Sequence, residues 1–206
     1  MLADNGRIRL ACPEAYEVHR SIIEWGARFS ADRIPDQSLG VNALTARLVK
    51  WELKSWSRVD FVNRYLLGTL APRVQLDFLP ALLCGAHLLL RPVRPPVVLL
   101  DYVDAGVAMQ RLWLTATACG LQLQPQMTPV IFRWYVRSGA RMSVLPEIDR
   151  SAAVLVEQFE RLASAGTGDA FAFFCRVGDG APPRSRSIRK PLDELMQAVT
   201  TLAREP

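Results

Sequence analysis

The segment from Asp101 to Gly120 constrains the fold more than any other part of the chain, because its apolar side chains recur at helical spacing on most sides. One predicted helical face carries small or apolar residues only: Tyr102, Ala105, Gly106, Met109, Leu112, Trp113 and Ala116. A second face carries Val103, Val107, Leu114 and Ala118. A helix that is apolar on so many sides has to be covered by other parts of the protein. We therefore expect a long helix that is buried in the core or in a subunit interface.

Short apolar runs around this helix predict strands. Ala81 to Leu90 and Val97 to Leu100 are aliphatic and flanked by prolines, as buried strands often are. The three prolines between Arg91 and Pro96 exclude regular structure there. Phe171 to Val177 is a further apolar run, and Arg7 to Ala11 is a candidate for one more short strand.

Helical spacing recurs in the rest of the chain. It predicts helices from Pro13 to Phe29, after Asn42, from Val59 to Leu66, after Asp149 or Ser151, and from Pro191. Leu121 to Ile131 contains two prolines and three glutamines and is predicted to be extended or looped. This order predicts an α+β fold in which helices dominate. Because no repeat or linker interrupts the sequence, we expect a single domain over residues 1–206.

Composition excludes several broad classes of protein. The 206 residues are 50% hydrophobic and 22% charged, which is typical of a folded domain rather than a disordered chain. The longest apolar stretch, Leu79 to Leu90, is interrupted by Gly85 and His87 and is too short to cross a bilayer. No secretory signal precedes it. We expect a soluble, cytoplasmic protein without a membrane partner, and the high apolar content favours a homodimer.

Familiar catalytic and metal-binding motifs are absent from the sequence. The four cysteines form no CxxC pair, and we interpret them as buried, reduced thiols. The two histidines do not share a metal-binding spacing, so no metal centre is expected. We interpret His19 as a surface or capping residue, and Asp60, Asn63 and Arg64 as a solvated helix face or the lining of a pocket. Rossmann, P-loop and nucleophile-elbow signatures are also missing.

A basic loop near the end of the chain is the first candidate site. Four cations and two serines occupy the seven residues from Arg184 to Lys190, after a predicted strand and before a predicted helix. Arginine side chains bind phosphate oxygens in pairs, and a helix start adds backbone N–H donors. The candidate phosphate contacts are Arg184, Arg186, Ser187, Arg189 and Lys190. The alternative is an ordinary solvated loop. One tight cluster lacks the broad basic face typical of nucleic-acid binding, so no nucleic-acid partner is expected.

Two glutamines form the second candidate site. Gln122 and Gln124 alternate with Leu121 and Leu123, so both amides are predicted to face the same side. Amide side chains can pair with the edge of a heteroaromatic ring.

The run from Tyr102 to Leu121 resembles the central helix of the flavin-dependent nitroreductase family, in which a similar pattern follows a buried strand. The strand Phe173-Phe-Cys-Arg-Val-Gly178, followed by Arg-Ser-Ile-Arg-Lys-Pro-Leu192, is similar to the C-terminal part of a divergent subgroup. Some members of that subgroup are fused to ThiF-like adenylating domains. The resemblance covers the second half of the chain better than the first.

The resemblance implies a small, mostly antiparallel sheet surrounded by helices, with a long buried central helix. It also implies a homodimer that binds FMN at the subunit interface. The flavin would take a hydride from NADH or NADPH and pass it to an organic acceptor, so no catalytic side chain is implied. On this reading the arginine loop contacts the FMN phosphate, and Gln122 and Gln124 lie beside the flavin ring.

The chain departs from the family at its N-terminal end. Members of the family carry an Arg- and Ser-rich segment there that binds the FMN phosphate, and we find no counterpart before Arg7-Ile-Arg-Leu10. Three explanations stay open at this point. A second chain or a ThiF-like domain supplies the missing contacts, the flavin binds differently, or the protein is a flavin-free binding or regulatory relative.

Overall fold

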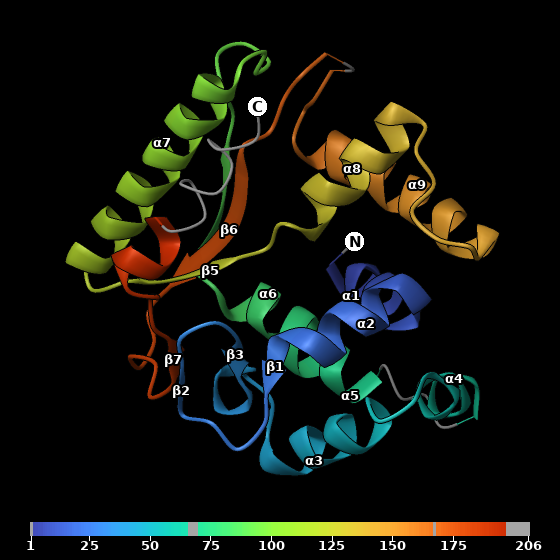
Figure 1. The fold of residues 1–206 in the computed structure, drawn as a ribbon. Helices are drawn as coiled ribbons and strands as arrows, with labels where there is room; N and C mark the ends of the chain where they lie inside the picture. Colours follow the sequence, from blue (N-terminus) through green and yellow to red (C-terminus); the bar gives the residue numbers. More distant parts are fainter. Residues whose placement is uncertain (1, 66–69, 167, 197–206) are drawn as a thin grey trace, which may run out of the picture.

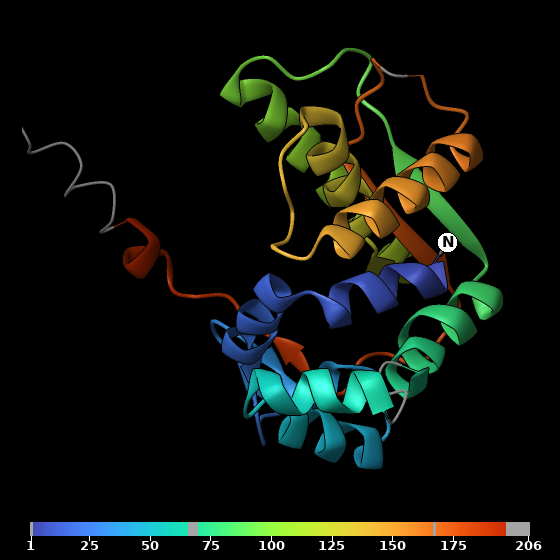
Figure 2. The same ribbon diagram turned by 90° about the vertical axis from the view of Figure 1, so that its right-hand side faces the viewer.

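A three-stranded antiparallel sheet lies between helices in this computed structural model, which describes residues 2–65, 70–166 and 168–196. The strand order is β4 (Ala86–Leu90), β6 (Phe173–Gly178), β5 (Gln122–Pro125), with β6 in the middle. Figures 1 and 2 show α7 on one face of the sheet and α9 on the other, with the helices of the N-terminal half gathered at one end of the sheet. The architecture is α+β with helices dominant, as predicted.

Alternation along β6 explains why this strand occupies the middle of the sheet. Phe173, Cys175 and Val177 face α7 and form one core with the half-buried Leu112 and Trp113. Phe174 points to the opposite face, where its ring lies 5.4 Å from that of Phe159 in α9. Because side chains of a strand alternate between faces, one apolar strand contributes to two cores.

Helix α7 (Leu99–Ala118) is present as predicted, but it is not buried within the described chain. Only one side packs on the sheet, and Ala116 is its single buried residue. The opposite side is open to solvent, with Leu100 64% and Leu114 59% exposed. A sheet of three short strands can cover one side of a helix of 20 residues, and no second layer of the described chain lies outside it.

A second core joins the sheet's other side to the start of the chain. Helix α8 (Thr128–Ser138) packs on α9 (Pro146–Leu162), and α9 packs on α1 (Leu2–Ala11). The buried members are Ile8, Cys12, Phe132, Ile148, Ala152, Leu155 and Val156. The predicted strand from Arg7 to Ala11 is therefore wrong. Ile8 and Cys12 are four residues apart, so both meet α9 when this segment is helical.

The remaining elements of the N-terminal half are short. They are α2 (Pro13–Ile22), β1 (Ile23–Glu24), β3 (Ile34–Pro35), a 3₁₀ turn (Asp36–Ser38), α3 (Ala43–Glu52), α4 (Trp56–Tyr65), α5 (Leu70–Arg73), a π-helical turn η2 (Val74–Phe78) and α6 (Leu79–Leu83). Strands β1 and β3 pair in parallel. None of the described helices is both long enough and apolar enough to cross a membrane.

Several boundaries differ from the sequence prediction. The helix expected from Pro13 to Phe29 ends at Ile22, and short strands follow it. Only the second half of the run from Ala81 to Leu90 is a strand, because α6 takes the first half. The expected strand from Val97 to Leu100 instead leads into α7, where the Asp101 carboxylate accepts hydrogen bonds from the Val97 and Val98 N–H groups. The segment from Leu121 to Ile131 forms β5 and the start of α8. The helix expected from Pro191 is seen over residues 192–196, and its continuation lies outside the described residues.

An ion-pair cluster joins α8 to α9. Arg133 Nε and Arg137 Nε donate to Glu160 Oε1 over 2.7 and 2.9 Å, and a second Arg137 nitrogen reaches Glu160 Oε2. Hydrogen bonds from Arg137 and Arg133 hold the pKa of the Glu160 carboxyl below its usual value. Glu160 and Arg133 are both buried. If one of the two charges were removed, water could not reach the other to solvate it.

We predict that Glu160→Gln lowers the free energy of unfolding by about 3 kcal/mol at pH 7, because it leaves the buried Arg133 charge without a carboxylate. Urea denaturation measures the loss. Glu157→Gln, on the exposed side of the same helix, is the control and should cost less than about 0.5 kcal/mol. Equal stability of the two variants would contradict a structural role for the cluster.

Candidate functional site

The basic loop is attached to a segment from the opposite end of the chain. Strand β7 (Arg186–Ser187) pairs in parallel with β2 (Phe29–Ser30). The Arg186 N–H donates to the Arg28 carbonyl over 3.2 Å, and the Ile188 N–H donates to the Ser30 carbonyl over 2.6 Å. Figure 1 shows β2 and β7 side by side.

The two serines of the loop hold this pairing in place. Ser185 Oγ donates to the Arg28 carbonyl over 2.6 Å, and Ser187 Oγ donates to the Arg33 carbonyl over 2.8 Å. Lys190 Nζ lies 3.1 Å from Asp32 Oδ1 in an ion pair. The hydroxyl hydrogen of Ser187, a predicted phosphate contact, is thus already used in a hydrogen bond within the protein. The Ser187 oxygen can still accept a hydrogen bond.

Five exposed arginines lie on the two segments that meet here. This arginine patch consists of Arg28, Arg33, Arg184, Arg186 and Arg189. Within the described part of the chain none of the five forms an ion pair; the Arg28 Nε–H donates only to the Arg184 carbonyl, over 2.9 Å. Arg28 and Arg33 were not predicted as site residues, because their spacing in the sequence gives no sign of the pairing with a segment more than 150 residues away.

The predicted glutamine pair lies on β5, away from the contacts of this patch. Gln124 Oε1 accepts from the guanidinium of Arg176, with 3.1 Å to Nε. Gln122 is half-buried opposite Gly178. Among the described residues neither amide hydrogen-bonds to the arginine patch, so the structure does not bring the two predicted groups of site residues into direct contact.

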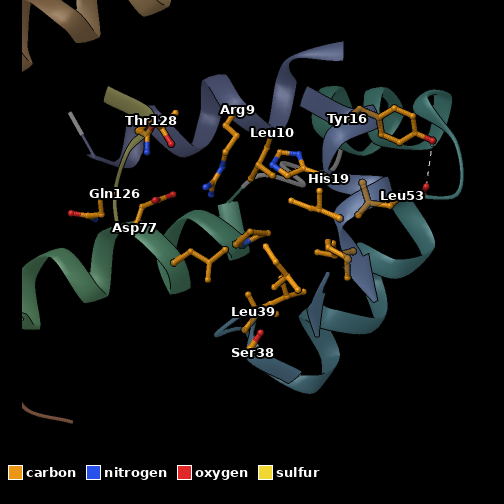
Figure 3. A pocket seen from close by; sticks show the side chains of 18 of the residues that line it. Arg9, Leu10, Tyr16, His19, Ser38, Leu39, Leu53, Asp77, Gln126 and Thr128 are labelled. Carbon is orange, nitrogen blue, oxygen red and sulfur yellow. Dashed lines mark hydrogen bonds between the residues drawn. The ribbon is translucent and has the colours of Figure 1, made fainter. Parts of the chain in front are cut away.

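A partly open cavity of about 360 Å³ forms between the helices of the N-terminal half and the end of β5. Its apolar wall is aliphatic: Leu10, Ile22, Ile23, Ile34, Leu39, Val41, Val49, Leu53, Val59 and Leu76. Its polar end is formed by Asn5, Arg9, Asp77, Gln124, Gln126, Thr128 and Arg176. Figure 3 shows Arg9 and His19 projecting into it from α1 and α2, with Asp77 and Gln126 on the opposite side.

The polar end holds several buried groups that lack a hydrogen-bond partner. Asn5 and Asp77 are 4% and 5% exposed, yet Asn5 Oδ1 and Asp77 Oδ2 have no partner in the described structure. The same is true of Arg9 Nε and Gln126 Oε1. Buried polar atoms are normally hydrogen-bonded, so an unsatisfied set around one cavity indicates a place for a polar ligand.

The Asp77 carboxylate in η2 lies where α1 approaches η2 closely. A Cβ atom on Gly6 would lie 2.1 Å from Asp77 Oδ2, so only glycine lets α1 approach this carboxylate. Burial raises the pKa of Asp77, while the nearby charges of Arg9, Arg176 and Arg73 oppose that rise.

Two more titratable groups line the cavity. Burial, assisted by the charge of Arg9, lowers the pKa of His19 to about 4, so its imidazole is neutral at pH 7. The prediction of a surface histidine is therefore wrong. At the apolar side burial raises the pKa of Glu52 to about 7, and Glu52 Oε1 has no hydrogen-bond partner. Nearby, Tyr16 Oη donates to the Leu53 carbonyl over 3.3 Å (Figure 3).

The structure agrees with some of the remaining sequence predictions and differs from others. Asn63 lines the cavity and donates to the Leu10 carbonyl over 3.1 Å, whereas Asp60 and Arg64 form an exposed ion pair. Of the cysteines, Cys12 and Cys175 are buried as expected, Cys84 is half-buried, and Cys119 is exposed because it ends α7 at the surface.

No family model, curated protein or solved structure matches this chain. The features that bear on function are therefore the arginine patch, the cavity and the resemblance carried by the sequence.

We predict that the free energy of unfolding falls between about pH 5 and pH 8 through Glu52. Its carboxyl keeps a proton in the folded protein after the unfolded chain has released it, so stability present at low pH is lost as the pH rises through about 7. Glu52→Gln should remove up to about 3 kcal/mol of this pH dependence. Urea titrations at several pH values measure it, with Glu17→Gln on an exposed position as the control. Parallel pH profiles for wild type and Glu52→Gln would contradict the assignment.

Proposed function

We propose that this chain is an FMN-dependent oxidoreductase of nitroreductase type that acts as a homodimer. The flavin, when bound, accepts a hydride from NADH or NADPH and donates it to an organic acceptor. The observation that supports the proposal is the arginine patch, in which five exposed arginines without an ion pair among the described residues lie on two segments that pair from distant parts of the chain. Such groups bind phosphate oxygens in a bidentate fashion, and FMN has one terminal phosphate.

Arg28 and Arg33 could take the place of the Arg- and Ser-rich N-terminal segment of the nitroreductase family, for which this sequence has no counterpart. Both belong to the N-terminal half, and both lie beside the loop from Arg184 to Lys190. Cations from the two halves of one chain thus meet at one surface. This arrangement supports a phosphate site that needs no second protein or ThiF-like domain to supply its charge.

The loop's own hydrogen bonds support a preorganised site. Ser185 and Ser187 fix the loop to the segment carrying Arg28 and Arg33 before any ligand arrives. Since Lys190 is paired with Asp32, the arginines are the cations available to an anion. A ligand phosphate then has to order side chains rather than backbone, which reduces the entropy cost of binding.

The open side of α7 supports the homodimer. Leu100, Val103, Val107 and Leu114 form an exposed apolar stripe with spacings of three, four and seven residues, which are those of a coiled-coil seam with the polar Gln110 at the position between Val107 and Leu114. An exposed stripe of this kind on a folded domain marks an interaction surface.

Charges beside the stripe favour an antiparallel pair of α7 helices. Asp104 and Arg111 are one heptad apart on the same flank, both are exposed, and neither has an ionic partner in the described chain. An antiparallel arrangement about a two-fold axis near Val107 brings Asp104 close to the partner's Arg111 twice. A parallel pair would offer no opposite charge to either residue.

The flavin proposal predicts that Arg33→Ala/Arg189→Ala weakens FMN binding at least tenfold. Each lost charge-assisted hydrogen bond is worth about 1.5–3 kcal/mol. The measurement is the visible flavin spectrum after FMN addition and desalting, with a titration for affinity. Arg20→Ala/Arg47→Ala removes the same charge from exposed positions elsewhere and is the matched control.

Wild-type protein that stays colourless after exposure to FMN would overturn the flavin proposal and favour the flavin-free binding protein. Flavin retention equal in the two double variants would overturn the role of the arginine patch. Oxidation of NADH or NADPH with a nitroaromatic acceptor then tests the reaction itself in the flavin-loaded protein.

The dimer proposal predicts that Val107→Glu halves the mass in solution, from a dimer of the 23.0 kDa chain to a monomer. A buried, unpaired charge at the seam is the reason. Thr115→Glu, outside the stripe, should stay dimeric. Asp104→Arg should weaken the dimer, and adding Arg111→Asp should restore it, as sedimentation equilibrium would show. A wild-type monomer at all accessible concentrations would contradict the proposal.

A further inference from the structure

The cavity is a second site, distinct from the arginine patch, because no residue of the patch lines it. It combines a largely aliphatic wall, interrupted by the Glu52 carboxyl, with one end rich in polar groups, and its volume of about 360 Å³ is within the range of sites for small organic molecules. Its contents must therefore be apolar over most of their surface and polar at one end.

Arg9 determines the charge of that polar end. Its guanidinium projects into the cavity (Figure 3), its Nε is buried without a hydrogen bond, and it has no ionic partner in the described chain. The neighbouring cation, Arg176, already donates to the Leu76 carbonyl and to Gln124. Arg9 is thus the cation at this end whose donors are still available.

The groups facing Arg9 offset its charge only in part, because Asp77 attracts it without forming a direct ion pair. Asp77 lies opposite, but its Oδ2 packs against Gly6 and makes no hydrogen bond. His19 is neutral at pH 7, and Asn5 and Gln126 are uncharged. With Arg9 and Arg176 positive and Asp77 the one carboxylate, the polar end has an excess of positive charge even when Asp77 is fully ionised.

We propose that the cavity binds a small organic carboxylate, with its carboxylate on the Arg9 guanidinium and its apolar body against the aliphatic wall. A guanidinium fork matches the two oxygens of a carboxylate, and two parallel hydrogen bonds fix the orientation of that pair. The unpaired oxygens of Asn5 and Gln126 can accept hydrogen bonds from a donor beside the carboxylate, since amide orientation can adjust to the ligand.

Calorimetry on the full chain with two matched probes tests this inference. Indole-3-propionate carries the carboxylate, and indole-3-propionamide has nearly the same shape without the charge. We expect the acid to bind the wild type at least tenfold more tightly than the amide. Equal affinities, or binding of neither probe, would overturn the proposal.

Variants locate the contact. Arg9→Met should bring the acid down to the affinity of the amide, whereas Arg9→Lys should retain part of the preference and Arg7→Met, at an exposed position of the same helix, should retain all of it. Val49→Phe fills the apolar side and should weaken both probes. A preference for the acid that persists in Arg9→Met would place the carboxylate elsewhere.

FMN retention separates the cavity from the flavin site. Arg9→Met should keep FMN affinity unchanged, and Arg33→Ala/Arg189→Ala should keep the preference for the acid. Loss of FMN in Arg9→Met would identify the cavity as the flavin site and overturn the assignment of a separate carboxylate site.

Discussion

The buried guanidinium of Arg176 connects the two halves of the molecule. It belongs to the central strand β6 and is 7% exposed, and it donates to Gln124 on β5 and to the Leu76 carbonyl in η2. A buried guanidinium that lost one of these acceptors would carry the full cost of an unsatisfied charged donor. Sheet and N-terminal helices are therefore held at one fixed separation, and the cavity lies in the space that this separation leaves.

Elements with strong periodicity were predictable from the sequence, while their surroundings were not. The apolar pattern of α7, α9 and β6 gives each its type, because these patterns extend over several turns or alternations. Arg7 to Ala11 is too short to distinguish a strand from a helix, and contact with α9 decides the outcome. How much of the α7 surface is buried depends also on the number of strands that pack against it. The residues of α7 themselves do not determine that number.

The candidate sites also combine residues that the sequence pattern indicates with residues that only the tertiary structure brings together. The loop from Arg184 to Lys190 could be predicted because its cations lie close together in the sequence. Arg28 and Arg33 lie beside this loop through the pairing of β2 with β7, which no local sequence pattern indicates. Likewise, a lone histidine or arginine in an N-terminal helix has no sequence signature. His19 and Arg9 become notable only where α1 and α2 enclose a cavity against η2 and β5.

The pairing of β2 with β7 also has a consequence for when the site comes into being. Ser185 and Arg28, which are hydrogen-bonded, are separated by 157 positions along the chain. Contacts of such separation close a very large loop and form late, after local elements have assembled. During synthesis the N-terminal arginines leave the ribosome long before their partners do. The complete patch therefore exists only after both segments have been synthesised and have paired, so its positive charge is assembled by tertiary folding rather than by either segment alone.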